Sequence, residues 1–216
     1  MDIREAQIRE EIVAVSQALD DAGLVPNKSG NVSRRSSGGF LITPAGVPYR
    51  ELTPGQIVAS NPGGEPEQGG ARPSSEWRMH AAIYAQRPDV SAIVHTHSPH
   101  ATALACAGRG IPPFHYMIAL AGGDICCMPY ATFGTPELAD NAVRGLAGRR
   151  ATLLANHGVM AVGASLREAH SVAVEVENLA GQYLALLAAG LQPLLLSDGE
   201  LQKVIGKFQD YGRLEP

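Results

Sequence analysis

Short apolar segments with strand character occupy the middle of this chain, and helical patterns precede, separate and follow them. Residues 4–22 repeat apolar side chains on one helix face, at Ile8, Ile12, Val15 and Leu19. From residue 31 to residue 60 the pattern changes to brief β-rich runs separated by turns rich in glycine, serine and proline. Strands in the middle with helices around them favour an α/β fold, a three-layer α/β/α sandwich around a mostly antiparallel sheet.

Turn and capping residues mark the ends of the remaining elements. Proline follows a hydroxyl residue at Ser98 and at Thr135, so each hydroxyl is expected to cap a helix that begins at the proline. Ser165 and Glu168 form a capping box before a long apolar stripe. The expected helices are 75–87, from 99, from 136, from 165 to about 190, and from 197; the expected strands are 31–33, 40–42, 57–59, 92–97, 125–128, 151–154 and 159–162.

The length and composition are those of a globular protein. With 216 residues the chain is long enough for one well-buried core and short for two, so we expect one domain over residues 1–216. Apolar residues make up 45% and charged residues 18%, which excludes a fibrous or disordered class. No repeat, linker or charge block divides the sequence.

Charge and cysteine content narrow the function classes. The formal net charge is −4 and no run of Lys or Arg stands out, so neither a nucleic acid nor a membrane partner is expected. The charged N-terminal segment and the absence of a long apolar stretch favour a cytoplasmic protein. Cys106, Cys126 and Cys127 are odd in number and lack a C-x-x-C spacing, so we interpret them as structural thiols in a reducing compartment.

The most specific local feature is the pair His95 and His97. Alternate residues of a strand project from the same face, so the two imidazoles of the expected strand 92–97 point the same way and can share one metal ion. His157 follows the apolar strand 151–154 in a turn, a position where functional sites commonly open. Three neutral imidazoles with a free fourth position are the ligand set of catalytic zinc, whereas structural zinc is usually closed by cysteine-rich ligands.

The alternative for each histidine is an ordinary surface or hydrogen-bonded core residue. An H-x-H pair alone does not establish a ligand set. The apolar residues 91–94 before the pair favour a buried strand whose end, rather than its middle, carries the polar groups. We interpret the other four histidines as structural residues: His80, His100, His115 and His170.

Two polar segments are suited to an anion. Glu76 follows Ser74 and Ser75 at a predicted helix start, where hydroxyls and free N–H groups can bind phosphate. The Glu76 carboxylate can instead be only a first-turn charge that complements the helix dipole. Residues 28–31, Lys-Ser-Gly-Asn, offer an ammonium, a hydroxyl, close backbone approach and an amide. Turn chemistry is the plainer interpretation of either segment taken alone.

Seven segments together resemble one known family. They are Ser29–Ser33, Thr43–Gly46, Pro73–Arg78, His95–His97, His115–Ala119, Tyr130–Thr135 and Asn156–Gly158. They occur in the order found in class II aldolases of the fuculose-phosphate aldolase type, from about residue 5 to Tyr211. The resemblance implies a fold of the class II aldolase type and an enzyme, a metal-dependent carbon–carbon lyase.

The resemblance also implies roles for individual residues. His95, His97 and His157 match the zinc-binding histidines, and Glu76 matches an acidic residue that acts as acid and base and can be a fourth ligand. Zn²⁺ is the expected cofactor, with Mn²⁺ or Co²⁺ as alternatives. The residues that match the substrate phosphate-binding segments are Ser29, Gly30, Asn31, Thr43, Gly46, Ser74 and Ser75.

Two tyrosines complete the implied site. Tyr116 matches a tyrosine that reaches into a neighbouring subunit's site, and Tyr211 matches one in a mobile C-terminal tail. The resemblance therefore implies a homotetramer with active sites at subunit interfaces. Lys28 departs from the family pattern, which has a threonine beside the phosphate loop, and is a further candidate phosphate contact. The tail after Tyr211 also differs from that of the resembling enzymes.

The lysines favour metal chemistry over a Schiff base as the way to stabilise the enediolate of an aldol cleavage. The chain has only Lys28, Lys203 and Lys207, in a polar loop and a short final helix, so none is a candidate for a desolvated amine. The expected reaction is reversible cleavage of a ketose 1-phosphate, L-fuculose 1-phosphate or a similar sugar, into dihydroxyacetone phosphate and a short aldehyde such as L-lactaldehyde. Tyr116 would take the C4 hydroxyl proton, and Glu76 would exchange the proton at the enediolate carbon.

Other functions on the same scaffold stay open. 5-Deoxyribulose 1-phosphate and methylthioribulose 1-phosphate present the same phosphate and diol as L-fuculose 1-phosphate. A ribulose-phosphate 4-epimerase breaks and reforms the same bond, although such enzymes use further acidic and histidine groups. A non-catalytic domain like the head of adducin has no need of a metal, so a stoichiometric bound metal would count against it.

Overall fold

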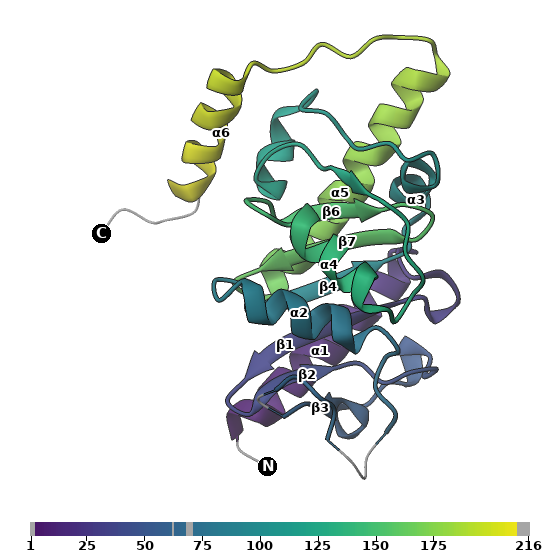
Figure 1. Cartoon of the computed structure of the whole chain (residues 1–216), viewed down its shortest axis with the longest axis vertical. Helices are drawn as coiled ribbons and strands as arrows, with labels where there is room; N and C mark the ends of the chain where they lie inside the picture. Colours follow the sequence, from purple (N-terminus) through teal and green to yellow (C-terminus); the bar gives the residue numbers. More distant parts are fainter. Residues whose placement is uncertain (1–2, 62, 68–70, 211–216) are drawn as a thin grey trace.

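The computed structural model describes residues 3–61, 63–67 and 71–210. Within these residues seven strands form one sheet, in the order β3-β2-β1-β4-β7-β6-β5 (Figure 1). Every neighbouring pair is antiparallel except β5 and β6, which are parallel. The strands are β1 Gly30–Ser36, β2 Gly39–Ile42, β3 Val58–Ala59, β4 Ala92–Thr96, β5 Cys127–Met128, β6 Ala151–Leu154 and β7 Gly158–Gly163. The mostly antiparallel sheet predicted from the sequence is confirmed.

Helices cover both faces of the sheet, and Figure 1 shows α2 and α4 in front of it with α1 and α5 behind. The α-helices are α1 Ile3–Asp21, α2 Trp77–Gln86, α3 Pro99–Cys106, α4 Pro136–Gly145, α5 Leu166–Ala188 and α6 Asp198–Asp210. The 3₁₀ helices are η1 Pro26–Lys28, η2 Tyr49–Glu51, η3 Pro54–Gln56 and η4 Tyr116–Ala121. The helix α6 reaches η4 through an extended segment and packs its Leu201 into the core there.

Two apolar cores lie on the two sides of the sheet because strand residues alternate between them. In β4 the fully buried Ile93 packs with α2 and α4, while its neighbour Val94 packs with α1, α3 and α5. Met160 and Ala161 of β7 divide in the same way. The three-layer α/β/α sandwich is therefore confirmed. The organisation of residues 1–216 as one domain stays a prediction.

The helix caps agree with the sequence at some positions and differ at others. The Thr135 hydroxyl caps α4 by accepting from the N–H of Leu138, as predicted. Ser98 was expected to cap α3, and this is wrong: its hydroxyl makes no cap hydrogen bond. The carboxylate of Glu177 in α5 accepts from the first N–H groups of α3 instead, those of His100 and Ala101. A carboxylate from a neighbouring helix satisfies both N–H groups at once, so the serine is not needed for the cap.

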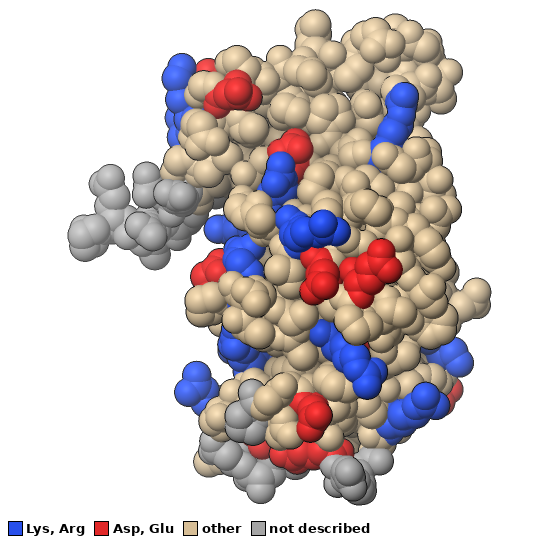
Figure 2. Space-filling model, viewed as in Figure 1, with Lys and Arg blue, Asp and Glu red and all other residues tan. Residues whose placement is uncertain are grey.

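Charge on the surface is mixed, and Figure 2 shows basic and acidic side chains interspersed over the face that carries α2 and α4. Cys106, Cys126 and Cys127 are free; Cys106 is exposed and the other two are half-buried, so their role as structural thiols stays a prediction. No helix within the described ranges combines the length and the apolar character needed to cross a membrane. A cytoplasmic location stays a prediction.

Candidate metal centre and substrate cleft

His95 and His97 stand at the end of β4, the central strand of the sheet. His95 is fully buried. Its Nδ1 lies 2.8 Å from the carbonyl oxygen of Val159 in β7, which can only accept, so Nδ1 carries the ring proton. Nε2 is then left with its lone pair directed away from β7. A backbone hydrogen bond to one ring nitrogen is the usual way in which a protein orients a metal-binding histidine.

His157 reaches the same point from the turn between β6 and β7. The turn is tight: Asn156 has a left-handed φ of 56°, and its N–H donates to the carbonyl of Ala105. At Gly158 the backbone lies so close to β4 that an added Cβ would meet the carbonyl oxygen of Thr96 at 2.3 Å. Only glycine permits this approach, which brings His157 beside the end of β4.

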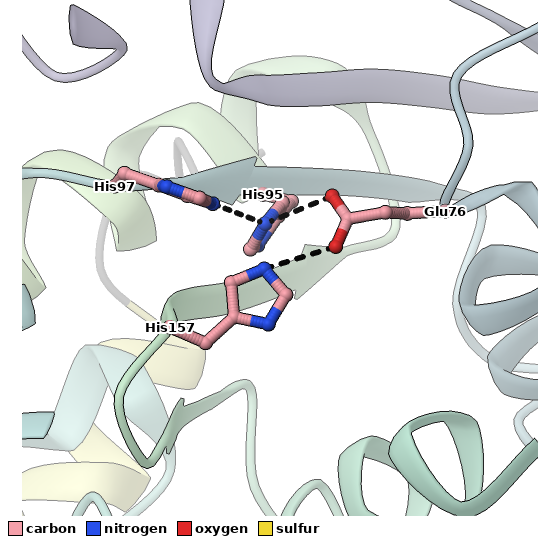
Figure 3. A group of neighbouring side chains, drawn as sticks. All are labelled: Glu76, His95, His97 and His157. Atoms are coloured by element: carbon pink, nitrogen blue, oxygen red, sulfur yellow. Dashed lines mark hydrogen bonds and ion pairs between the residues drawn. The ribbon is translucent and has the colours of Figure 1, made fainter. Parts of the chain in front are cut away.

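The three imidazoles surround one common point (Figure 3). Each pair of ring centroids is 4.9 Å apart, and the rings are nearly perpendicular to one another, with interplanar angles of 75°, 88° and 83°. The Nε2 atoms of His95 and His97 are 3.0 Å apart. The convergence of these three distant histidines, expected from the sequence, is observed.

Glu76 brings a carboxylate to the same point. Its Oε2 lies 3.2 Å from His95 Nε2, and its Oε1 lies 2.9 Å from His157 Nε2. Glu76 is the N-cap residue of α2, but its side chain makes no cap hydrogen bond. The carboxylate therefore faces the imidazoles rather than the helix, which rules out a role confined to the helix dipole. The nearby Ser74 hydroxyl accepts from the N–H of Glu76.

Electrostatics couple these four groups. Burial alone would raise the pKa of Glu76, but the His95 and His157 imidazoles outweigh it and hold the pKa of the carboxyl well below its usual range. Burial opposes the charged form of His95, yet the Glu76 carboxylate outweighs it, and the pKa of His95 is raised. Burial, followed by the charges of His95 and His157, lowers the pKa of His97 to about 3. His97 is thus neutral near pH 7, the form that binds metals.

These residues fit a divalent transition-metal ion. The four ligand atoms of Glu76, His95, His97 and His157 all lie within 4.8 Å of one another. Tetrahedral zinc holds its nitrogen and oxygen ligands at about 2.0–2.1 Å, which puts them about 3.4 Å apart, close to the separations found here. Within the described part of the chain, buried Oε1 of Glu76 receives no hydrogen bond, although His157 Nε2 is near. A cation would satisfy that oxygen and the imidazole lone pairs together.

A cleft of about 430 Å³ opens from this centre. Six of the residues predicted to hold a phosphate line it: Ser29, Gly30, Asn31, Gly46, Ser74 and Ser75. The predicted contact Lys28 lines it as well. Thr43 does not, because it is buried behind the cleft, where its hydroxyl accepts from the N–H of Val32 and its carbonyl from the N–H of Ser74. Thr43 thus ties the segments around Asn31 and Ser74 to each other.

The Lys28 loop is shaped by its backbone. Asn27 and Lys28 are both left-handed, with φ of 55° and 64°, and Gly30 has φ of 119°. An added Cβ at Gly30 would meet the carbonyl oxygen of His95 at 2.5 Å, so glycine is required for the loop to lie against the metal centre. The exposed Lys28 Nζ lies 3.5 Å from the carbonyl oxygen of Gly46, across the mouth of the cleft.

The two tyrosines are not part of this cleft. Tyr116 begins η4, is 53% exposed and stacks against Phe208 of α6 with the ring centroids 6.4 Å apart. It is not among the residues that line the cleft within the described chain. Tyr211 lies outside the described residues. Six further residues line the cleft that were not assigned to the site from the sequence, although all lie in matching segments: Pro44, Ala45, Tyr130, Ala131, Phe133 and Asn156.

The hydrogen bonds behind Glu76 were not predicted from the sequence. Asn31 Nδ2 donates to Glu76 Oε2 at 2.9 Å, so the Asn31 amide serves the carboxylate as well as lining the cleft. His80 is a buried hydrogen-bonded residue, as expected, but its partner is Asn31. No local sequence signal connects these positions, which are 49 residues apart.

Comparison with known proteins agrees with this geometry. A family model described as the class II aldolase and adducin N-terminal domain matches residues 10–184. A 5-methylthioribulose-1-phosphate/5-deoxyribulose-1-phosphate aldolase of Rhodospirillum rubrum is 47% identical over 206 residues, which are 95% of this chain and 92% of the relative. An L-fuculose phosphate aldolase of Escherichia coli K12 is 45% identical over 207 residues, 95% and 96% of the two chains. A solved L-fuculose 1-phosphate aldolase matches with a TM-score of 0.90 at 38% identity, covering 94% of this chain and 96% of that one.

The chain belongs to the class II aldolase and adducin N-terminal domain family. Within that family its near relatives are aldolases matched over almost their whole length, and the Glu/His₃ group of a metal-dependent enzyme is present. It is therefore a class II aldolase, a carbon–carbon lyase. The names of the two relatives differ in the sugar phosphate that is cleaved.

Proposed function

We propose that this enzyme is a zinc-dependent aldolase that reversibly cleaves a ketose 1-phosphate into dihydroxyacetone phosphate and a short aldehyde. The observation that carries the proposal is that one cleft holds both the Glu/His₃ group and the predicted phosphate-binding segments. L-Fuculose 1-phosphate, with L-lactaldehyde as its aldehyde product, is one candidate substrate. 5-Deoxyribulose 1-phosphate and 5-methylthioribulose 1-phosphate are supported equally, because relatives so named have similar identities of 47% and 45%.

Metal chemistry is the route that the residues favour. Lys28, Lys203 and Lys207 are all exposed, and Lys203 is paired with Glu200, so none is the desolvated amine of a Schiff-base aldolase. His95, His97 and His157 would hold the zinc, with Mn²⁺ or Co²⁺ as alternatives, and Glu76 is a candidate fourth ligand. When bound, the ion supplies a Lewis acid that polarises the ketone and stabilises the charge left by cleavage.

Glu76 is the acid and base of the proposed reaction. In the direction of synthesis its carboxylate removes a proton from the hydroxymethyl carbon of dihydroxyacetone phosphate. The electron pair of that carbon forms the new bond to the aldehyde carbon, and the aldehyde oxygen takes up a proton. The low pKa of Glu76 supports a carboxylate that is ionised before the reaction begins. Cleavage runs through the same steps in reverse.

The polar segments of the cleft would hold the substrate phosphate. Ser74 and Ser75 precede α2, where backbone N–H groups and the helix dipole favour an anion. Ser29, Gly30, Asn31 and Gly46 approach from two other loops, and Thr43 supports them from behind. Lys28 adds a positive charge at the mouth of this cleft, where it can offset one of the phosphate charges.

The proton at the aldehyde oxygen would come from Tyr116 of a second copy of this chain. Tyr116 of the same chain is exposed and does not line the cleft, so a site that uses it is completed only by assembly. We therefore propose a homotetramer with active sites at subunit interfaces. Tyr211, in the tail beyond the described residues, is proposed as a further contributor.

A coupled assay for dihydroxyacetone phosphate tests the function. Each of the three candidate ketose 1-phosphates is offered to the enzyme with and without a chelator. We expect release of dihydroxyacetone phosphate from at least one of them, loss of activity with chelator, and recovery with added Zn²⁺. Chelator-resistant activity would contradict the metal route. A pentulose phosphate that is epimerised without free dihydroxyacetone phosphate would instead identify a 4-epimerase.

Mixing two inactive variants tests the assembly. The Glu76→Gln and Tyr116→Phe chains are combined under conditions that allow subunits to exchange. If sites are shared between copies, some mixed sites receive both native residues, and activity returns to a fraction of the wild-type rate. A mixture as inactive as its two components, with exchange of subunits demonstrated, would show that Tyr116 does not act in a neighbouring site.

A further inference from the structure

A continuous chain of hydrogen bonds runs through the interface between the sheet and α2 and ends on Glu76. Tyr84 Oη lies 2.8 Å from Ser33 Oγ, and Ser33 Oγ lies 2.6 Å from His80 Nδ1. His80 Nε2 lies 2.5 Å from Asn31 Oδ1, and Asn31 Nδ2 lies 2.9 Å from Glu76 Oε2. All five residues are buried, and Tyr84, Ser33 and His80 do not line the cleft.

The chemistry of the groups gives every bond in this chain the same direction. The Glu76 carboxylate can only accept, so the Asn31 amide turns its NH₂ group to Glu76 and its oxygen to His80. Nε2 of His80 must then carry a proton. Burial lowers the pKa of His80 to about 3, so the ring is neutral and its Nδ1 accepts.

The donors and acceptors at the other end of this hydrogen-bond chain follow in the same way. Because Nδ1 of His80 accepts, the Ser33 hydroxyl donates to it. A hydroxyl has one proton, so Ser33 Oγ must accept from Tyr84. The Arg35 guanidinium lies 4.7 Å above the Tyr84 ring and donates to the backbone carbonyl of Tyr84. Tyr84 is thereby held at the start of the chain.

A one-way chain of donors fixes the rotation of the carboxylate at its end. Turning the Asn31 amide over would oppose its NH₂ group to the Nε2 proton of His80 and its oxygen to Glu76, leaving two buried repulsive contacts. Oε2 of Glu76 is therefore committed to Asn31. Oε2 also lies 3.2 Å from His95 Nε2, and Oε1 is left facing the His157 ring at 2.9 Å.

We propose that Tyr84, Ser33 and His80 are positioning residues, which act through Asn31 to hold the Glu76 carboxylate in one rotation at the metal centre, with Oε2 on Asn31 and Oε1 beside His157. This rests on the proposed role of Glu76 as the group that exchanges the substrate proton. His80 is thus more than a hydrogen-bonded core residue. It determines that the NH₂ end of the Asn31 amide, rather than its oxygen, meets the Glu76 carboxylate. Its effect on catalysis passes entirely through Asn31 and Glu76.

Three variants of α2 test this inference. His80→Phe keeps the ring size but removes both ring nitrogens. His80→Gln can keep an N–H donor near the position of Nε2. Ile83→Val, at a fully buried site in the same core, removes one methylene without altering these hydrogen bonds and controls for lost stability.

Each variant is assayed for exchange of solvent deuterium into dihydroxyacetone phosphate, for Zn²⁺ content and affinity by chelator competition, and for thermal unfolding. We expect His80→Phe to slow the exchange by about 10- to 100-fold while one Zn²⁺ per chain remains. His80→Gln should recover most of the rate, and Ile83→Val should match wild type despite a lower melting temperature. Exchange at the wild-type rate in His80→Phe, or no recovery in His80→Gln, would overturn the proposal.

A spectroscopic measurement and a milder variant cover the case in which His80→Phe fails to fold. Nitrogen NMR of the whole protein is expected to show His80 neutral with its proton on Nε2; a proton on Nδ1 would overturn the proposal. Ser33→Ala is expected to slow the exchange by a smaller factor of about 3- to 10-fold. An unchanged rate would contradict the positioning role of these hydrogen bonds. If the wild-type enzyme exchanges no proton, the proposed function fails, whereas the tautomer of His80 still tests the direction of the chain.

Discussion

The two halves of the cleft are built on different principles. At the metal centre, His95 is fully buried and Glu76 is 7% exposed, and each is oriented by hydrogen bonds to strands far away in the sequence. At the phosphate loops, Lys28 and Ser75 are exposed, and the shape comes from left-handed backbone and a helix start.

This difference separates two kinds of function. Buried groups around one point act as a unit, so losing one ligand leaves the others with unsatisfied lone pairs or charges. Exposed groups around a phosphate each contribute only part of the binding free energy. When one of them is removed, solvent and neighbouring N–H groups replace part of its hydrogen bonding. Substitutions at the metal centre should therefore abolish the reaction, and those at the loops should weaken binding by degrees.

The largest expected effect is that of His157→Ala. Removing one of the three imidazoles should empty or greatly weaken the metal site, and the loss of several kcal/mol of Lewis-acid stabilisation lowers kcat by roughly a thousandfold or more. Metal content and dihydroxyacetone phosphate release are measured together. His170→Ala, a half-buried histidine on α5, is the matched control and should retain both. Full metal content in His157→Ala would contradict the assigned ligand set.

The next effect is that of Glu76→Gln. The amide cannot take up the substrate proton, so deuterium exchange into dihydroxyacetone phosphate should fall by about 10²- to 10⁴-fold. Three imidazoles remain, so Zn²⁺ should still bind. An exchange rate equal to that of wild type in the metal-loaded variant would remove the assigned role of Glu76. Loss of Zn²⁺ together with activity would show that the carboxylate is first of all a ligand.

In the loops, Lys28→Ala should act on binding. Loss of a charge-assisted contact to phosphate is expected to raise KM by about 10- to 100-fold with kcat nearly unchanged, and to make KM less dependent on salt. Lys203→Ala, which removes a lysine of the same charge on α6, is the control. An unchanged KM in Lys28→Ala would mean that the ammonium is solvated and takes no part in phosphate binding.

The smallest effect is expected for Ser75→Ala. An exposed neutral hydroxyl contributes one hydrogen bond of about 0.5–1.5 kcal/mol, so KM should rise by roughly two- to tenfold. Thr135→Ala removes the cap of α4 and should lower stability by about 1 kcal/mol without changing KM. A loss of kcat in Ser75→Ala as large as that of Glu76→Gln would contradict the division of the cleft into a metal centre that carries the reaction and loops that only bind phosphate.

The same contrast explains how much could be predicted from the sequence. The two-residue period of a strand places His95 and His97 on one face, and the position of His157 in a turn directly after a strand makes it a further candidate. The three histidines of the metal centre therefore follow from local patterns. Glu76 was ambiguous because a carboxylate at a helix start also suits the dipole; only its orientation away from the helix decides. The layers and the mostly antiparallel sheet follow from the order of apolar runs.

Features that depend on contacts between distant segments could not be predicted. The cap of α3 comes from Glu177, more than 70 residues away, which made the expectation for Ser98 wrong. His80 meets Asn31 only because α2 packs across β1, so its link to Glu76 has no sequence signature. The left-handed Lys28 is likewise a property of the folded loop, since a lysine carries no local preference for that conformation.

X-ray absorption spectroscopy of the zinc-loaded enzyme can identify the atoms bound to the metal. We expect one Zn²⁺ per chain, with nitrogen and oxygen ligands at about 2.0–2.1 Å and the multiple-scattering pattern of three imidazoles. The His157→Ala variant should lose one imidazole from that pattern or the metal itself. A sulfur ligand at about 2.3 Å, or fewer than three imidazoles in the wild-type enzyme, would contradict the metal centre described here.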